Sequence, residues 1–381
     1  MGNNIEIEYN RSRIDYLLAL YNMSEDGLLS MLNEGMKNPY TKKNISGRTI
    51  KESILKKIGK IFNKDIYFFI DFSELKINSA SSIFFRKNNF ATQPNMEARR
   101  IVCHYEDLKN TISAYCKLGK FQFQRKLKKY TTNDSAKEIA FFYHDILFTN
   151  KRNKAKEMLK ILIDNLAEAN VYVFEYIEHP NKKEKSNIDG FFLRPNIIVL
   201  KRQQKAFNRE IFTLAHEFGH YLLDYEDMDE LDDDPLTNNH HNNSQEKWCN
   251  EFAFHFIAGK EISSSLDNIH VDTNNDYEEV IENIAKTIHL SQSAIYTHLY
   301  LNQKMTFNVY NVIKLRLNEE LSDREAIRSA ERPKSFSQPK PIQSNLFIKT
   351  MQLAYYKGVV GDMEFCSKLH IESNQMDKYL E

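Results

Sequence analysis

Two histidines four residues apart constrain this chain more than any other feature. His216 and His220 enclose Glu217, Phe218 and Gly219 within an apolar stretch. On a helix, residues i and i+4 lie about 40° apart around the axis, so both imidazoles can bind one metal ion. Glu217 projects about 100° away from the first histidine. It is therefore placed to accept a proton from an attacking water rather than to bind the ion. The spacing predicts a helix that carries a zinc site.

The same spacing also arises by chance, and two helical histidines can simply be satisfied by hydrogen bonds. The context favours the metal site. Apolar residues stand on both sides of the motif (Ile211, Phe212, Leu214, Ala215, Tyr221, Leu222 and Leu223). A helix with such flanks is expected to be buried, and burial supplies the low dielectric in which a metal charge acts strongly.

A catalytic zinc needs a third protein ligand and one open position. The next helical segment, at 245–253, places Glu246 and Asn250 on one face at i and i+4. Glu246 as a ligand gives a His2Glu set, and Asn250 could then orient a ligand side chain. Glu251 is an alternative ligand one position further round the helix. Cys249 is a possible soft ligand, but its thiolate would close the open position, so a small buried residue is the favoured interpretation.

Two motifs taken together resemble the ImmA/IrrE family of zinc peptidases. The first reads R-E-I-F-T-L-A-H-E-F-G-H over residues 209–220, and the second reads E-K-W-C-N-E-F-A over residues 246–253. The resemblance implies that His216, His220 and Glu246 bind one catalytic Zn2+ and that Glu217 is the general base.

The resemblance also implies a zincin-like peptidase domain with a small β-sheet packed on the HExxH helix. A helix-turn-helix before the peptidase and a short helical tail after it are common in that family. This chain departs from the family pattern at two positions. Cys249 stands where Ala is usual, and Gly259 stands where Pro is usual. The end of the ligand helix is therefore expected to differ.

Apolar periodicity predicts a mainly helical α+β fold. Short helices are expected near the N-terminus, where Ser24 has the position of an N-cap. Strands are predicted at 171–174, 191–193 and 197–200, just before the HExxH helix. The expected organisation is a helix-turn-helix-like domain at 1–75, a mainly helical connecting region at 76–135, the metallopeptidase domain at 136–327, a linker at 328–345 and a small helical unit at 346–381.

The N-terminal region is locally basic. Residues 37–64 contain nine basic residues and one acidic residue, Glu52. One interpretation is a DNA-binding or partner-binding face that includes Lys42, Lys43, Arg48 and Lys51. The other interpretation is an ordinary solvated helical surface. The match to a helix-turn-helix is weak, because the usual compact pattern is missing.

Bulk composition excludes little and favours a cytoplasmic protein. Lys plus Arg and Asp plus Glu both total 52, so no global charge argues for nucleic acid or membrane. Four cysteines stand far apart without CxxC spacing, which is typical of a reducing compartment. The sequence shows neither a signal-peptide pattern nor an apolar run long enough to span a bilayer.

These features predict metal-assisted hydrolysis of a peptide bond. The family resemblance implies a regulatory substrate, such as a repressor or an antitoxin-like DNA-binding protein with a helix-turn-helix. Two alternatives remain open at this point: a DNA-binding regulator that uses the zinc fold as a sensor, and a peptidase toxin of a toxin-antitoxin or phage-defence system. A strand beside the cleft, predicted at 197–200, could hold an extended peptide by strand addition.

Overall fold

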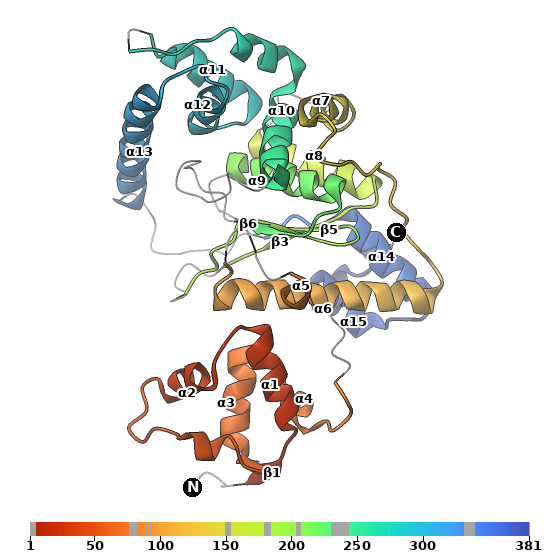
Figure 1. Cartoon of the computed structure of the whole chain (residues 1–381). Helices are drawn as coiled ribbons and strands as arrows, with labels where there is room; N and C mark the ends of the chain where they lie inside the picture. Colours follow the sequence, from red (N-terminus) through yellow and green to blue (C-terminus); the bar gives the residue numbers. More distant parts are fainter. Residues whose placement is uncertain are drawn as a thin grey trace. The chain divides into compact units, whose positions relative to one another are not determined.

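The computed structural model describes residues 5–75, 82–87, 90, 93–148, 154–178, 184–202, 207–229, 244–273, 275–330 and 340–380, with only the backbone described at 324–330. Contacts divide the chain into two compact units. Unit 1 comprises Met1–Asn89 and Pro94–Glu106, and unit 2 comprises Phe90–Gln93 and Asp107–Glu381. Helix α6 (Met96–Gly119) begins in unit 1 and ends in unit 2 (Figure 1). Compact units need not fold independently, so the five-part organisation drawn from the sequence stays a prediction.

Unit 1 is a small helical unit with one two-stranded sheet. Its elements are β1 (Glu6–Glu8), α1 (Arg11–Leu20), α2 (Glu25–Asn33), η1 (Lys42–Asn44), β2 (Thr49–Lys51), α3 (Glu52–Phe62), α4 (Ile66–Ile70) and α5 (Ile83–Arg86). The hydroxyl of Ser24 accepts the Gly27 N–H and caps α2, as its position predicts. Ile14, Leu28 and Ile58 are fully buried in the core of this unit.

Unit 2 contains a four-stranded sheet in the order β3-β5-β4-β6. The strands are β3 (Tyr172–Tyr176), β4 (Gly190–Leu193), β5 (Ile197–Lys201) and β6 (Met228–Asp229). β3 is parallel to β5, and the other pairs are antiparallel. All three predicted strands form, with bounds shifted by one or two residues. Nearly every residue of β3, β4 and β5 is buried, so both faces of the sheet are covered.

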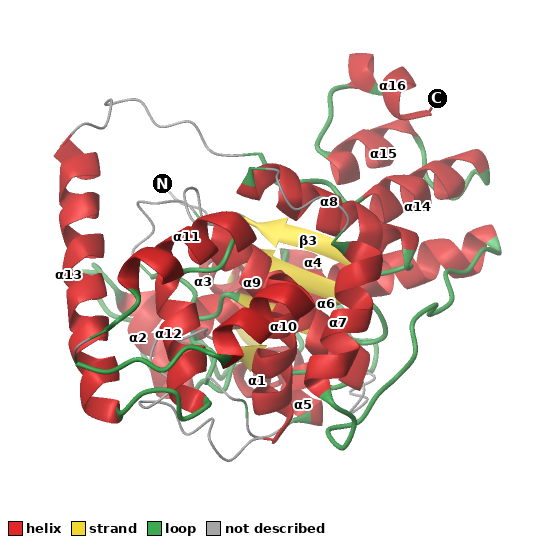
Figure 2. Cartoon of the chain, turned by 90° about the horizontal axis from the view of Figure 1, so that it is seen from above, coloured by secondary structure: helices red, strands yellow, loops and turns green. Residues whose placement is uncertain are grey.

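Helices cover this sheet on two faces. On one face lie α7 (Ala136–Leu147), α8 (Ala155–Glu168), α9 (Phe207–Leu223) and α10 (Ser244–Asp267) (Figures 1 and 2). The opposite face packs against α14 (Asn345–Tyr356), where Phe347 meets Phe174 of β3 and Thr350 shares a hydrogen bond with Tyr172. The chain is thus a mainly helical α+β protein, as predicted.

Further helices extend unit 2 beyond the sheet. They are α11 (Glu278–Ile288), α12 (Gln292–Leu301), α13 (Phe307–Ala330), α15 (Asp362–Leu369), η3 (Ser373–Gln375) and α16 (Asp377–Leu380). None of the helices in the described part of the chain combines the length and the hydropathy that a membrane span requires.

Residues 121–135 are not helical, although a helical connecting region was expected there. α6 ends before Lys120, which has a positive φ of 53°. Beyond it, burial alternates along an extended segment, which is a two-residue rather than a helical period. The segment is fixed at its end by two bonds: Tyr130 N–H donates to Leu222 O of α9, and the indole of Trp248 in α10 donates to Asp134 O. It therefore belongs to the packing of unit 2.

α10 bends at Gly259, which has φ 70° and ψ 173°. A Cβ added there would lie 2.6 Å from Nε2 of His144 on α7. Only glycine adopts this backbone conformation readily. Proline, with φ fixed near −65°, cannot take its place. The bend at Gly259 is the physical reason for the different end of the ligand helix that the sequence predicted.

Two imidazoles connect α10 to α12. The ring of His298 stacks on Phe254 with centroids 3.6 Å apart and meets the edge of His255 at 5.1 Å. His255 Nδ1 also shares a hydrogen bond with Ser263 Oγ at 2.9 Å. Burial, with a smaller effect of Lys137, lowers the pKa of His255 to about 4. Burial, followed by the effect of His255, lowers the pKa of His298 to about 3. Both rings are therefore neutral near pH 7.

We expect unit 2 to lose stability as the pH falls below about 6.5, the pKa of histidine in an unfolded chain. Between that pH and the lowered pKa values, the unfolded chain binds more protons, so the free energy of unfolding decreases. The loss is at most about 1.4 kcal/mol per pH unit for each ring. Chemical denaturation at neutral and mildly acidic pH measures it. His298→Phe keeps the stacking but cannot titrate, so its stability should depend less on pH. An equal pH dependence in both proteins would contradict the prediction.

Candidate metal centre

The two histidines of the HExxH motif lie on α9, and Glu246 lies in the first turn of α10. All three side chains are buried. His216 Nε2 and His220 Nε2 are 3.0 Å apart. Glu246 Oε2 is 3.2 Å from His216 Nε2, and Glu246 Oε1 is 3.3 Å from His220 Nε2. The three residues thus form a compact cluster that could hold a metal ion.

The cluster has the size and chemistry of a metal site. Zinc–ligand bonds of about 2.0–2.1 Å in a tetrahedron put ligand atoms about 3.3 Å apart. Neither carboxylate oxygen of Glu246 accepts a hydrogen bond within the described part of the chain. Burial alone would raise the pKa of Glu246, but His220 and His216 outweigh it and hold that pKa well below its ordinary range. A buried carboxylate facing two imidazole nitrogens fits a cation between them.

Asn250 lies one turn after Glu246 and contacts the first histidine. His216 Nδ1 donates to Asn250 Oδ1 at 3.0 Å. Because an amide oxygen only accepts, this bond places the imidazole proton on Nδ1 and leaves the Nε2 lone pair for a metal. Asn250 thus contacts the first histidine, and its role in orienting a zinc ligand stays a prediction.

Glu217 lies beside β4, close to Gly190. Only a glycine at position 190 leaves room for this contact. A Cβ added to Gly190 would lie 3.1 Å from Glu217 Oε1 and 2.6 Å from Thr213 Cγ2. Glu217 itself is only 1% exposed. Gly190 was not among the site residues predicted from the sequence. The available signal was a glycine at the start of a strand, which often marks close approach of another element.

Arg209 of the family motif joins the start of α9 to the start of β4. Its Nη2 lies 2.6 Å from Asp189 Oδ2, one residue before Gly190. Asp189 is buried, so this charge-assisted hydrogen bond helps to fix the register of the helix against the strand. The contact between Gly190 and Glu217 follows from that register.

We expect Gly190→Ala to displace Glu217 and Thr213. Overpacking of this kind typically costs about 1–3 kcal/mol of stability. Because the contact involves Glu217 and Thr213 rather than the three cluster residues, zinc affinity should change less than the rate of hydrolysis. Thermal unfolding, zinc content and the hydrolysis rate measure the three effects separately. Gly358→Ala provides a comparison in open space, although its positive φ adds some strain. Full activity of Gly190→Ala would show that the position of Glu217 is not critical.

Neither alternative ligand is part of the cluster, although the Cys249 side chain lies beside His220. Glu251 is exposed. Cys249 is fully buried against Gly219, where an added Cβ would lie 3.2 Å from Cys249 Sγ. Burial, partly offset by His220, raises the pKa of the Cys249 thiol to about 11. A thiol rather than a thiolate is therefore present at neutral pH. The small Gly219 lets α9 and α10 approach each other at this point.

The prediction that the strand at 197–200 holds an extended peptide is wrong. β5, which contains residues 197–200, pairs with β3 on one side and with β4 on the other. Both of its edges are occupied, so no peptide can add to it. The edge strand on the Glu217 side of the sheet is β6, whose Asp229 pairs with Gly190.

The four basic residues proposed for DNA contact lie on η1, β2 and the turn between them. Lys42 pairs with Asp26 at 2.8 Å, and Arg48 pairs with Glu8 at 3.0 Å. Lys43 is exposed and Lys51 is half-buried. No α-helix occurs between α2 and α3 in this fully described stretch. α2 itself begins with Glu25 and Asp26, which would repel a phosphate backbone. DNA binding by residues 1–75 stays a prediction.

An HExxH helix packed on a small sheet, with an acidic residue brought in by the next helix, defines a metallopeptidase-type domain. Residues 166–297 match the family model Peptidase_M78, the IrrE N-terminal-like domain. The match includes the sheet, α9 and the whole His-His-Glu cluster. Over these residues the resemblance to the ImmA/IrrE family is confirmed. No curated protein and no solved structure matches the chain.

Proposed function

We propose that this chain is a zinc-dependent metalloendopeptidase that hydrolyses a peptide bond in a regulatory protein. The observation that carries the proposal is the buried cluster of His216, His220 and Glu246, with Glu217 next to the first histidine on the same helix. Two imidazoles and one carboxylate form the ligand set of known zinc peptidases and leave a fourth position open.

In this proposal His216, His220 and Glu246 hold one Zn2+. The ion supplies a Lewis acid that polarises the carbonyl oxygen of the scissile bond. Glu217 accepts the proton of the attacking water and passes it to the leaving amine. Asn250 fixes the orientation of the His216 ring through Nδ1. Gly190 and Arg209 set the position of Glu217 through the packing of α9 on β4.

An extended substrate segment would add beside β6. This strand pairs with β4 at Gly190 and Phe191 on one side, and none of the described residues pairs with it on the other. Strand addition uses main-chain hydrogen bonds, so it holds a peptide with little demand on its sequence. Gly190 pairs with β6 and lies next to Glu217, so a peptide added there would lie near the proposed general base.

A regulatory substrate is supported by the family resemblance and by the compact N-terminal unit that the chain carries besides the peptidase. The substrate class we propose is a DNA-binding repressor or an antitoxin-like protein with a helix-turn-helix. The alternative in which the zinc fold only senses a signal predicts no cleavage at all. A peptidase toxin uses the same site, and would reveal itself by toxicity that disappears in His216→Ala.

The test is incubation of the purified chain, loaded with zinc, with any DNA-binding regulator that is encoded next to its gene. Mass spectrometry should find one main cut, absent after treatment with a chelator and restored by added zinc. Unfolded casein serves as the comparison. If casein is cut as fast as the regulator, the enzyme is a general peptidase and the regulatory substrate is wrong. If neither protein is cut, the sensor alternative is favoured.

A further inference from the structure

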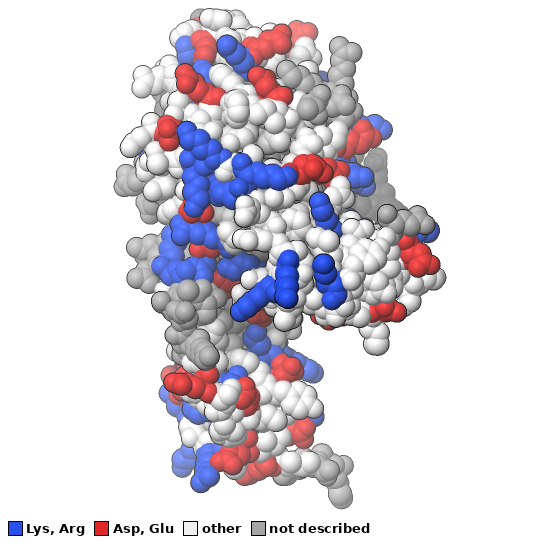
Figure 3. Space-filling model, turned by 90° about the vertical axis from the view of Figure 1, so that its right-hand side faces the viewer, with Lys and Arg blue, Asp and Glu red and all other residues white. Residues whose placement is uncertain are grey.

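A basic segment runs from the end of α6 into the extended stretch that follows. Residues 117–129 contain five lysines (117, 120, 126, 128 and 129) and Arg125, and no acidic residue. All five lysines are exposed. Figure 3 views the side on which α14 and the end of α6 lie in Figure 1, and shows Lys and Arg side chains gathered over unit 2. In a chain with no net charge, this is a local concentration of positive charge.

The side chains of this segment alternate between the protein and the solvent. Lys120, Gln122, Gln124, Lys126 and Lys128 are exposed, whereas the residues between them are half-buried. In an extended chain, side chains on one face repeat about every 6.6 Å. The segment therefore presents a row of hydrogen-bond donors on one face. We call these five residues the donor row.

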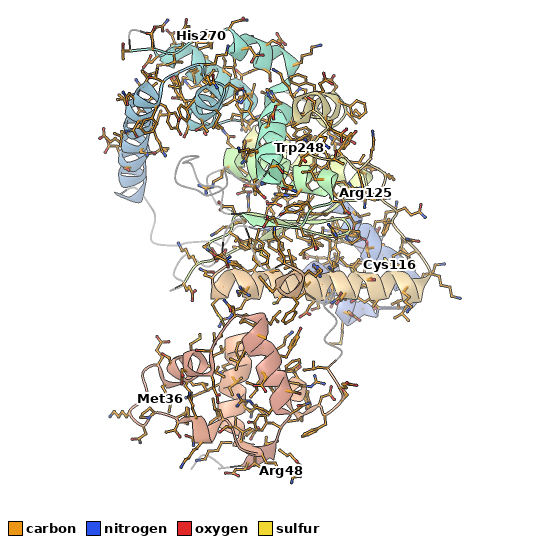
Figure 4. The ribbon with its side chains drawn as sticks, in the orientation of Figure 1. Met36, Arg48, Cys116, Arg125, Trp248 and His270 are labelled. Atoms are coloured by element: carbon orange, nitrogen blue, oxygen red, sulfur yellow. The ribbon has the colours of Figure 1, made fainter. Side chains whose placement is uncertain are left out.

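The inward-facing residues fix the backbone of the row. The ring of Phe123 packs against Tyr172 of β3 with centroids 6.3 Å apart. The guanidinium of Arg125 donates to Tyr221 O at 2.6 Å and lies over the Tyr221 ring at the end of α9 (Figure 4). Asn170 Nδ2 donates to Gln124 O. The row is thus ordered before any ligand binds, which lowers the entropic cost of binding.

The basic side chains of the segment differ in whether a carboxylate lies near them. Asp224 lies near both Lys129 and Arg125, at 2.7 and 3.8 Å, and so neutralises that end. Lys126 Nζ donates to the Glu168 carbonyl, and Lys128 lies over the Tyr130 ring. Within the described part of the chain, no carboxylate forms an ion pair with Lys117, Lys120, Lys126 or Lys128. These four cations remain able to meet an external anion.

The donor row reaches the C-terminal end of α8, where Lys126 contacts Glu168. Three further lysines, Lys154, Lys156 and Lys160, are exposed near the other end of this helix.

We infer that the donor row binds the phosphate backbone of duplex DNA without reading its sequence. Regularly spaced lysines and amides are donors suited to phosphate oxygens. The aromatic residues of the segment face inward, so they cannot stack on unpaired bases as single-strand binders require. Leu118 is the one strongly exposed apolar side chain between 117 and 129. A membrane surface or a protein partner would be expected to need more apolar anchors.

DNA binding by the donor row would give the proposed peptidase a means of finding its substrate. If the substrate is a DNA-binding regulator, which rests on the proposed function, then the peptidase and its target associate with the same polymer. DNA binding by the donor row can be tested independently of the proposed function, because it is measured without any substrate.

The experiment measures binding of the zinc-loaded full chain to a short fluorescent duplex of arbitrary sequence, by anisotropy over a range of salt concentrations. The test variant is the triple change Lys120→Gln, Lys126→Gln and Lys128→Gln. The matched control removes the same number of charges elsewhere in unit 2, with Lys260→Gln, Lys286→Gln and Lys304→Gln. Zinc content and thermal unfolding show that both variants remain folded.

For the wild type we expect binding that weakens steeply with salt. Each lost phosphate contact reduces the slope of log K against log salt by about 0.9, so the test variant should lose about 2.7 units of slope. Its affinity near 0.1 M salt should fall by more than about tenfold. The control variant should bind like the wild type.

Several results would overturn the inference. They are an absence of duplex binding by the wild type at low salt, and loss of binding in the control variant but not in the test variant. Equal competition by poly-L-glutamate would identify an acidic protein as the partner instead. Tighter binding to single-stranded DNA, or to vesicles of anionic lipid, would likewise replace duplex DNA as the ligand.

Discussion

Glu217→Gln should abolish most hydrolysis while leaving zinc bound. Gln has nearly the same volume, so the packing against Gly190 and Thr213 is kept. It cannot accept the proton of the attacking water, and loss of a general base typically costs about 10²–10⁴-fold in rate. The measurement is kcat on any protein or peptide that the wild type cleaves, together with the zinc content of the purified variant.

A matched control is available on the neighbouring helix. Glu251→Gln makes the same chemical change at an exposed position of α10, so its rate should equal that of the wild type. If Glu217→Gln cleaves at the wild-type rate, the general base is another group. If it loses zinc as well as activity, Glu217 contributes to the metal site rather than to proton transfer alone.

Glu246→Ala should remove the metal. Loss of an outer residue that orients a ligand typically costs about 10–100-fold in metal affinity. Loss of one of three ligands should therefore exceed about 100-fold. Competition with a coloured chelator measures the affinity directly. A second readout is the stability gained on metal binding, which amounts to about 4 kcal/mol when free zinc is 1,000 times its Kd.

The comparison variant is Glu251→Ala, because the sequence left both glutamates open as the third ligand. Its zinc affinity and its gain in stability should equal those of the wild type. The opposite result, in which Glu251→Ala loses zinc and Glu246→Ala keeps it, would falsify the cluster seen in the structure. Loss in both variants would point to a folding defect of α10, which the unfolding curves without zinc would reveal.

Local signals were sufficient to predict much of the fold. The N-cap at Ser24, the three strands before α9 and the helix with the two histidines all follow from residues close in sequence. The i, i+4 spacing of His216 and His220 implies a shared helical face, because helix geometry determines it. The same holds for Glu246 and Asn250 on α10.

Features that depend on distant contacts could not be predicted. Residue spacing alone could not exclude Glu251 and Cys249, because the face that α10 turns toward α9 is a tertiary property. Gly190 was overlooked because its role depends on Glu217, which is far away in the sequence. β5 precedes the HExxH helix directly, yet the order of strands in the sheet makes it an inner strand.

The bonds that residues 121–135 make to α9 and α10 bear on how this peptidase can be produced in isolation. A fragment cut to the family-matched residues 166–297 would lack α7, Arg125 and Asp134. The carbonyl of Tyr221 would then lose the bond from Arg125 and keep the one from the Asp224 N–H. The carbonyl of Leu222 would lose the bond from Tyr130, and the indole of Trp248 would lose its acceptor. Tyr143 would no longer cover Phe218 within the HExxH motif. The smallest soluble catalytic fragment should therefore start before residue 121, well upstream of the family boundary.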